Sequence, residues 1–119
     1  MATISKVLLS ESTNGKTITI DGTAAGSRDT IHTAVSGTSS IDEIWLYANN
    51  NSATSSNLLT IEWGDTTANK IITVLLNPGE TALVAPGLPL QNGLSVTGFC
   101  TTASYTDEIN VFGYVNRIV

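Results

Sequence analysis

The chain has little charge and almost no cysteine. Only 13% of its 119 residues are charged, and its five lysines and arginines are scattered and outnumbered by ten aspartates and glutamates. Binding to nucleic-acid phosphates requires several cations on one face, so we expect no nucleic-acid partner. The single cysteine, Cys100, excludes an intramolecular disulfide and a thiolate metal cluster. We expect it to be a small buried hydrophobic residue in a strand.

Long hydrophobic runs are also missing. No run approaches the roughly 18 apolar residues that a membrane-spanning helix needs, so we expect no membrane partner. The first residues, MATISK, have neither the basic start nor the apolar stretch of a secretory signal, and we expect a soluble, unprocessed chain. The length predicts one domain over residues 1–119, with residues 1–10 as an N-terminal arm or an edge strand.

Helical periodicity is absent from every segment longer than a turn. Instead, short alternating apolar segments are separated by Asn, Gly, Asp, Ser or Pro, as at the Asn14-Gly15 turn. The expected strands are residues 4–9, 16–21, 30–35, 41–48, 58–63, 70–76, 81–84, 94–100 and 108–118. This pattern predicts an all-β fold, an antiparallel β-sandwich or jelly roll of about eight strands.

The alternation assigns faces to individual side chains. In residues 58–63, the inward side chains are Leu59, Ile61 and Trp63, and the outward ones are Thr60 and Glu62. Residues 86–90 contain two prolines, which lack a backbone donor, so this segment is expected at a sheet edge or as a crossing segment. Residues 49–57 are predicted to form a polar loop without core contacts, and residues 101–106 another loop.

Two of the predicted strands carry apolar bulk on both faces. In residues 41–48, Trp45 and Tyr47 lie opposite Ile44, Leu46 and Ala48. In residues 108–118, Phe112 and Tyr114 share a face with Asn110 and Asn116, opposite Ile109, Val111, Gly113 and Val115. Such strands are central in a sandwich or have their aromatic face covered by a partner. Trp45, Tyr47, Phe112 and Tyr114 are therefore the candidate binding residues.

The aromatic side chains leave three interpretations open. Trp63 shares a face with Leu59 and Ile61, which favours core packing. Trp45 and Tyr47 are compatible with the sandwich core, with an interface to another protein, or with a platform on which sugar rings stack.

Residues that could carry chemistry are few. His32 is the only histidine and has no second ligand for a metal and no nucleophile at a diagnostic spacing, so we expect it at a strand surface or loop edge. The pairs Asp42-Glu43 and Asp107-Glu108 point to opposite faces of a strand and are expected to be solvated strand starts rather than an acid–base pair. Asp65 is expected to lie in a plain turn. We predict no enzyme, no catalytic residue, no metal and no cofactor.

Residues 40–114 resemble the small β-sandwich virion proteins of tailed bacteriophages, most of all the capsid decoration, or cement, proteins. The resemblance is carried by IWLYAN at 44–49, LTIEWG at 59–64, NPGET at 77–81 and EINVFGY at 108–114. It implies a jelly-roll-like homotrimer that binds the major capsid protein on the outside of the head. The protein would then be made in the bacterial cytoplasm and located on the virion. The alternative is a phage tail or fibre module that binds a host surface glycan through exposed aromatic side chains.

Overall fold

The computed structural model describes residues 2–101 and 108–119. The described residues form nine β-strands and one turn of 3-10 helix, η1. The elements are β1 (Ile4–Leu8), β2 (Ile18–Ile20), η1 (Ala25–Ser27), β3 (Asp29–Thr33), β4 (Ile41–Asn50), β5 (Asn57–Trp63), β6 (Ile71–Leu76), β7 (Thr81–Leu90), β8 (Ser95–Cys100) and β9 (Ile109–Ile118). In this part of the chain no helix is long and apolar enough to cross a membrane. Apart from Thr101, the loop expected at 101–106 lies outside the described residues.

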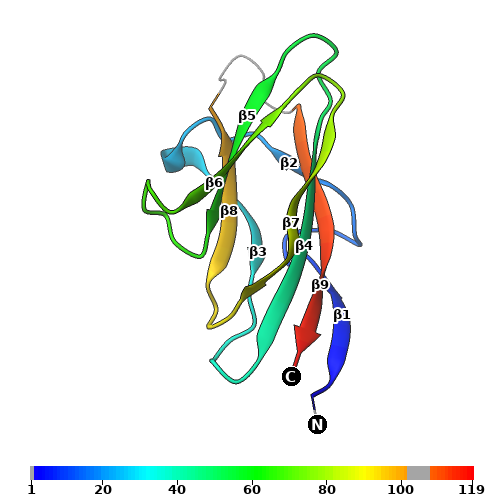
Figure 1. The fold of residues 1–119 in the computed structure, drawn as a ribbon, viewed down its shortest axis with the longest axis vertical. Helices are drawn as coiled ribbons and strands as arrows, with labels where there is room; N and C mark the ends of the chain where they lie inside the picture. Colours follow the sequence, from blue (N-terminus) through cyan, green and yellow to red (C-terminus); the bar gives the residue numbers. More distant parts are fainter. Residues whose placement is uncertain (1, 102–107) are drawn as a thin grey trace.

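The strands form two antiparallel sheets packed face to face (Figure 1). The five-stranded sheet has the order β1-β9-β4-β7, with β2 also paired to β9, and the four-stranded sheet has the order β3-β8-β5-β6. Strands β2 to β9 thus divide into two four-stranded sets in jelly-roll order. The predicted all-β, antiparallel β-sandwich is confirmed. The segment 86–90 continues β7, which is an edge strand as expected.

Strands β1 and β2 lie along the same edge of β9. Leu8 pairs with Tyr114 and Ile18 with Val111, and both strands run antiparallel to β9, so β2 continues the line of β1. The predicted Asn14-Gly15 turn is present, with positive φ at both residues. Instead of joining a hairpin, this turn returns the chain to the edge that it left after β1.

The core lies between the two sheets and consists mainly of aliphatic side chains. Its buried members are Leu9, Ile20, Ile31, Ile44, Leu46, Ala48, Leu59, Ile61, Leu76, Val84, Ala85, Val96, Cys100, Ile109, Val111 and Val115. Trp63 is partly buried against this cluster, and Cys100 is fully buried, both as predicted. Full burial of each large aliphatic side chain contributes about 1.5–3 kcal/mol, so the alternating positions of β4, β5 and β9 supply much of the folding free energy.

The outer face of β5 differs from the prediction. Thr60 and Glu62 point away from the core, yet each is only 2% exposed. The Glu62 carboxylate accepts hydrogen bonds from Arg28 Nε at 2.6 Å and from Thr97 Oγ1 at 2.7 Å. Burial raises the pKa of Glu62, but these bonds and the Arg28 charge outweigh it and hold the pKa below its ordinary value. The alternating sequence predicts the outward direction of the Glu62 side chain, whereas contacts with Arg28 and with β8 bury it.

The loop after β4 is anchored by a buried amide, contrary to the expectation of a loop without core contacts. Asn50 and Ser52 are buried. Asn50 Nδ2 donates to the carbonyl oxygens of Ser55 at 2.8 Å and Leu76 at 3.0 Å, and Asn50 Oδ1 accepts from the Ser52 N–H at 3.0 Å. A polar sequence can enter the interior here because each buried group has a hydrogen-bond partner.

Candidate functional site

The outer face of the five-stranded sheet carries an apolar strip. The strand register places Leu8, Tyr114, Trp45 and Pro86 in one row across β1, β9, β4 and β7, and Phe112, Tyr47 and Leu83 in the next row. We call these seven residues the aromatic face. The four residues singled out from the sequence are therefore brought together on two neighbouring strands.

The four aromatic rings form two stacked pairs. The Trp45 and Tyr114 ring centroids are 6.1 Å apart, those of Tyr47 and Phe112 are 5.6 Å apart, and each pair is within 12° of parallel. All four side chains are half-buried. Stacked pairs of this kind contribute about 0.5–1.5 kcal/mol each beyond the area that they bury. The pairs thus hold one another in place while leaving ring surface open to solvent.

Polar side chains border the aromatic face on the side nearer the chain termini. Glu43 Oε1 accepts hydrogen bonds from Trp45 Nε1 at 3.1 Å and from Asn116 Nδ2 at 3.2 Å. Lys6 Nζ lies 4.6 Å from the centroid of the Tyr114 ring, within range of a cation–π interaction. These contacts fix the orientation of the indole and place both signs of charge beside it.

The opposite border is formed by neutral hydrogen-bonding side chains. Thr19 Oγ1 donates to Asn110 Oδ1 at 2.8 Å, and Asn49 Nδ2 donates to Thr81 Oγ1 at 2.9 Å. An apolar centre between polar borders is the usual composition of a protein-binding surface.

Two glycines permit the close packing beneath the indole. Gly87 has φ +71°, and a Cβ at this position would lie 3.1 Å from Trp45 Cζ2. Gly113 has φ +155°, and a Cβ there would overlap the backbone carbonyl of Trp45. Both positions require glycine, one for the ring to lie against β7 and the other for β9 to pair with β4.

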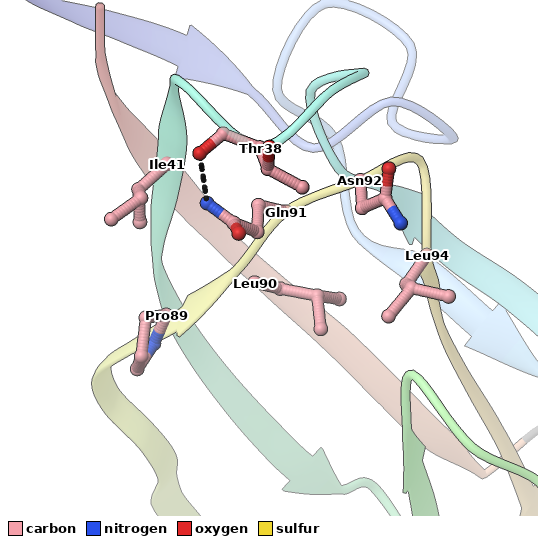
Figure 2. Close-up of a pocket in the computed structure, with 7 residues that line it drawn as sticks. All are labelled: Thr38, Ile41, Pro89, Leu90, Gln91, Asn92 and Leu94. Atoms are coloured by element: carbon pink, nitrogen blue, oxygen red, sulfur yellow. Dashed lines mark hydrogen bonds between the residues drawn. The ribbon is translucent and has the colours of Figure 1, made fainter.

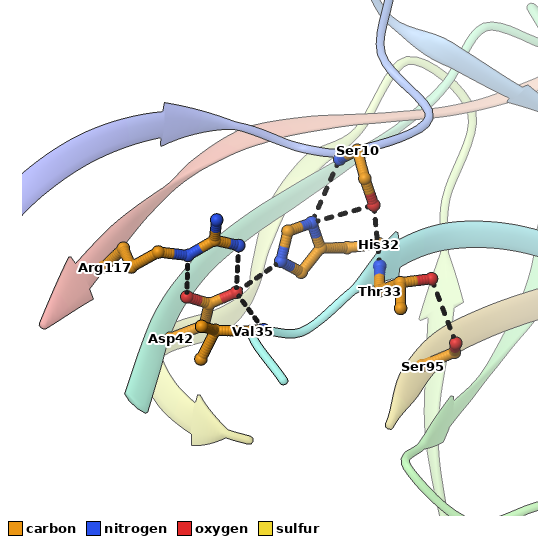
Figure 3. A network of polar contacts seen from close by, with 7 residues as sticks. All are labelled: Ser10, His32, Thr33, Val35, Asp42, Ser95 and Arg117. Atoms are coloured by element: carbon orange, nitrogen blue, oxygen red, sulfur yellow. Dashed lines mark hydrogen bonds and ion pairs between the residues drawn. The ribbon is translucent and has the colours of Figure 1, made fainter. Parts of the chain in front are cut away.

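A second cluster is buried between the sheets, and it corrects two expectations (Figure 3). His32 is 1% exposed and Asp42 is fully buried, so neither is a surface residue. Asp42 Oδ2 lies 2.8 Å from His32 Nε2, and the Asp42 carboxylate accepts two bonds from Arg117, at 2.8 and 3.0 Å, and one from the Val35 N–H at 3.1 Å. The register of β3 shifts between Thr30 and His32. This bulge breaks the strand alternation, so that Ile31 and His32 are both buried although they are neighbours in sequence.

The electrostatics of this cluster favour the charged carboxylate. Burial raises the pKa of Asp42, but the hydrogen bonds from Arg117, His32 and the Val35 N–H, together with the Arg117 charge, outweigh it. The pKa of Asp42 therefore lies below its ordinary value, and the pKa of Arg117 is raised by the same pair.

The fourth side chain of the cluster is Ser10, from the loop after β1. Its N–H donates to His32 Nδ1 at 3.0 Å, and its Oγ lies 3.1 Å from the same nitrogen. Since Nδ1 accepts this bond, Nε2 carries the proton that is donated to Asp42. Ser10 Oγ in turn accepts from the Thr33 N–H at 2.6 Å.

Serine, histidine and aspartate are the residue types of a hydrolase triad, but the bonding here is that of a structural tie. The lone pair of Nδ1 that a general base would use already accepts from the Ser10 N–H. The neighbouring N–H groups of Glu11 and Ser12 donate to Ile31 O and Leu9 O, so they do not point at a developing oxyanion. We interpret the cluster as the element that fastens the β1–β2 loop to β3, β4 and β9.

A pocket of about 480 Å³ lies at the end of the sandwich where β7 turns into β8 (Figure 2). It is lined by Thr38, Ile41, Pro89, Leu90, Gln91, Asn92 and Leu94. Gln91 Nε2 donates to the carbonyl oxygens of Thr38 and Ser40, and the Asn92 N–H donates to Gly37 O. No sequence pattern indicates this pocket, because its walls come from two segments, 38–41 and 89–94, that are more than 45 residues apart along the chain.

The remaining candidates do not form a site. Asp65 Oδ1 accepts from the Thr67 N–H at 2.8 Å, and Asp65 Oδ2 lies 3.6 Å from Lys70 Nζ, so this segment is the plain turn that was predicted. Asp107 lies outside the described residues. Within residues 2–101 and 108–119, no group of three or more His, Cys, Asp or Glu side chains is placed to hold a metal ion.

Comparison with known proteins identifies no relative of this chain. No protein-family model, no curated protein and no solved structure matches the chain.

Proposed function

We propose that this protein is a structural virion protein, a capsid decoration protein of a tailed phage. In this proposal it binds the outside of the head, at junctions between subunits of the major capsid protein, and stabilises the shell. The aromatic face is the surface that meets the capsid. The single observation that carries the proposal is the two stacked aromatic pairs, which are only half-buried on the outer face of the five-stranded sheet.

The composition of this face supports a protein partner. Tyr, Trp and Phe are enriched at the centres of protein interfaces, and interface centres are poor in charge. The aromatic face contains four such rings and no charged residue, while Lys6 and Glu43 stand at its border. Leu8 and Leu83, at its two ends, are 48% and 47% exposed.

The stabilising effect follows from mass action. A protein that binds the assembled shell, but not separated capsid subunits, stabilises the shell by RT ln(1 + [L]/Kd), which is about 2.7 kcal/mol at a concentration of 100 Kd. Each large aromatic side chain buries about 150–250 Å² when it is covered. The proposal includes a homotrimer, because three linked faces bind a multivalent shell more tightly than one.

The first test is the copy number of the chain in purified particles of the virus that encodes it. Quantitative mass spectrometry against the major capsid protein should give hundreds of copies per virion. A few to a few dozen copies would place the chain in the tail or fibre, and its absence from particles would refute both virion roles.

The second test is binding to particles that lack the protein. Wild-type protein and the Trp45→Ala and Phe112→Ala variants are titrated onto such particles, with Leu94→Ala as control because Leu94 is 45% exposed and lies outside the aromatic face. Removing an interface aromatic ring should weaken binding roughly tenfold or more, while the control binds like wild type. Equal binding by all four proteins would refute docking through this face.

A tail or fibre module that binds a host glycan is the second candidate, and the surroundings of Trp45 favour it. Glu43 and Asn116 place hydrogen-bonding groups directly beside the stacked Trp45 and Tyr114 rings, and sugars need both a ring to stack on and polar partners. A glycan array with wild type and Trp45→Ala decides this case. Binding that is lost in the variant supports the glycan role, and no binding to any glycan refutes it.

A further inference from the structure

In the part of the chain that the structure describes, three of the four sheet edges are protected against pairing with another strand. On β7, Pro86 and Pro89 lack backbone donors, and two register shifts interrupt the pairing with β4. On β3, the β1–β2 loop covers the edge, since the Glu11 N–H donates to Ile31 O. On the edge of β1 and β2, β2 has three residues and Lys6 is the central residue of β1. Short strands and lysines both oppose edge-to-edge association.

The fourth edge, β6, has none of these protections. Among the described residues β6 pairs only with β5, in an unshifted register. Its sequence, IITVLL, contains neither proline nor charge. Leu75 is 60% exposed, Thr73 is exposed and Ile71 is partly exposed. An exposed apolar edge strand of this kind is a site of association with another strand.

A hydrogen bond on β5 identifies the backbone groups of β6 that face the open edge. The Thr101 N–H, directly after β8, donates to Leu58 O, so Leu58 bonds on the β8 side of β5. Successive residues of an antiparallel strand direct their backbone groups to opposite sides. Leu59 and the opposite residue Val74 therefore bond to each other. It follows that alternate residues of β6 direct their N–H and C=O groups to the open edge, and these residues are Ile71, Thr73 and Leu75.

We propose that β6 pairs antiparallel with β6 of a second copy, about a two-fold axis at Thr73. In this register Thr73 lies opposite Thr73 of the second copy, and Leu75 lies opposite its Ile71. All three residues direct their backbone groups across the joint, so each opposed pair makes two backbone hydrogen bonds. A surface that contacts itself about a two-fold axis closes at two copies, and the protected edges leave no second place for a strand to add.

The same register matches the side chains on both faces of the joined sheet. On the outer face Leu75 meets Ile71, and the two threonines face each other, as threonines on paired strands do through hydroxyl hydrogen bonds. On the face toward the other sheet, Ile72 meets Val74, and both already pack against the core. A register slip by two residues would instead place Leu75 or Ile71 opposite a threonine.

Opposite charges meet at the two ends of this pair. Lys70 of one copy lies opposite Leu76 of the other. Directly after Leu76, the Asn77 N–H donates to Glu80 Oε1 at 2.8 Å, which holds the Glu80 carboxylate at the end of the strand. Lys70 is 67% exposed, and its own ion pair with Asp65 is an exposed one at 3.6 Å, which contributes little. The register therefore brings each Lys70 near a carboxylate of the other copy.

This contact lies outside the proposed function. It uses β6 of the four-stranded sheet, whereas the aromatic face lies on the five-stranded sheet. A two-fold contact cannot relate neighbours around a three-fold axis. If the trimer of the proposed function forms, the β6 contact joins copies that belong to different trimers.

Cysteine cross-linking at the two-fold axis tests the register. In Thr73→Cys the two thiols lie on opposed residues with Cα atoms about 5.5 Å apart, a distance that a disulfide spans. Leu75→Cys is the matched control, since it lies on the same strand and face but opposite Ile71. Both variants are oxidised mildly and analysed on a non-reducing gel, and Cys100 is buried and does not compete. We expect a covalent dimer from Thr73→Cys and monomer from Leu75→Cys.

The other outcomes overturn the pairing. Linking of Leu75→Cys alone would show a different register, equal linking of both variants would show chance collision, and linking of neither would show that β6 does not meet a second copy. Sedimentation of wild type at micromolar concentration should show dimers, or trimers joined to one another. A wild type that stays a monomer or a single trimer refutes the β6 contact, whereas capsid docking is judged separately by the particle titration.

A charge reversal gives an independent measurement. Lys70→Glu should raise the dissociation constant of the β6 contact roughly tenfold, because like charges would then meet at both ends of the pair. Lys16→Glu is the control, since it makes the same change of charge at an exposed residue away from β6. Equal dissociation constants in the two variants would refute the approach of Lys70 to Glu80 and with it the register.

Discussion

Replacing Asp42 with alanine should lower the free energy of unfolding more than the removal of any other single carboxylate. Asp42 is fully buried and accepts four hydrogen bonds, two from Arg117, one from His32 and one from the Val35 N–H. Alanine leaves the His32 Nε2–H in the interior without an acceptor and removes the counter-charge of Arg117, whose side chain is 30% exposed.

The magnitude follows from these partners. Removing one member of a buried ion pair destabilises a protein by about 3–5 kcal/mol, of which each buried donor left unpaired accounts for about 1–3 kcal/mol. Because Arg117 can turn partly toward solvent, we expect Asp42→Ala to lose about 3–4 kcal/mol. For a domain of this size that loss lowers Tm by roughly 12–16 °C.

Urea unfolding followed by tryptophan fluorescence and by circular dichroism measures the loss. The control is Asp65→Ala, which removes a carboxylate that is 42% exposed and 3.6 Å from Lys70. Its free energy of unfolding should stay close to that of wild type. A loss of less than about 1 kcal/mol in Asp42→Ala would show that the buried cluster does not fasten the two sheets, and the structural-tie interpretation would be abandoned.

Further predictions concern backbone packing, pH and thiol chemistry. Gly113→Ala should abolish folding or lower Tm severely, because the added methyl overlaps a β4 carbonyl, while Gly26→Ala, where a Cβ meets open space, should be silent in the same thermal melt. The folded-state pKa values of Asp42 and Glu62 are lowered, so their contribution to stability is complete above the unfolded values of about 4 and is lost as pH falls through the folded values. Urea midpoints should therefore be flat near neutral pH and drop below about pH 4, and a constant midpoint down to pH 2 would contradict this assignment. Burial, with a smaller contribution from a nearby aspartate, raises the pKa of Cys100 to about 12, so a thiol reagent at pH 8 should label it only at the rate of unfolding; rapid labelling of native protein would show that the thiol is accessible.

The sequence by itself determined the fold class and the content of the aromatic face. Alternation with a period of two is a local property, so residues 41–48 and 108–118 already showed that Trp45 shares a face with Tyr47 and that Phe112 shares a face with Tyr114. The sequence left open whether these faces lie in the core or outside it. The prolines of 86–90 likewise excluded a central strand, since they lack backbone donors, and left an edge or a crossing segment; the structure shows the edge.

Only the tertiary structure decided which residues meet and which are covered. The Asp42–Arg117 pair joins residues 75 positions apart, and a bulge in β3 turned His32 inward against its alternation. Glu62 is buried because Arg28 lies over it, and β1 pairs with β9 rather than with its neighbour in sequence. Each of these outcomes depends on strand pairing across the chain, and pairing is selected by the free energy of the whole core rather than by any local pattern.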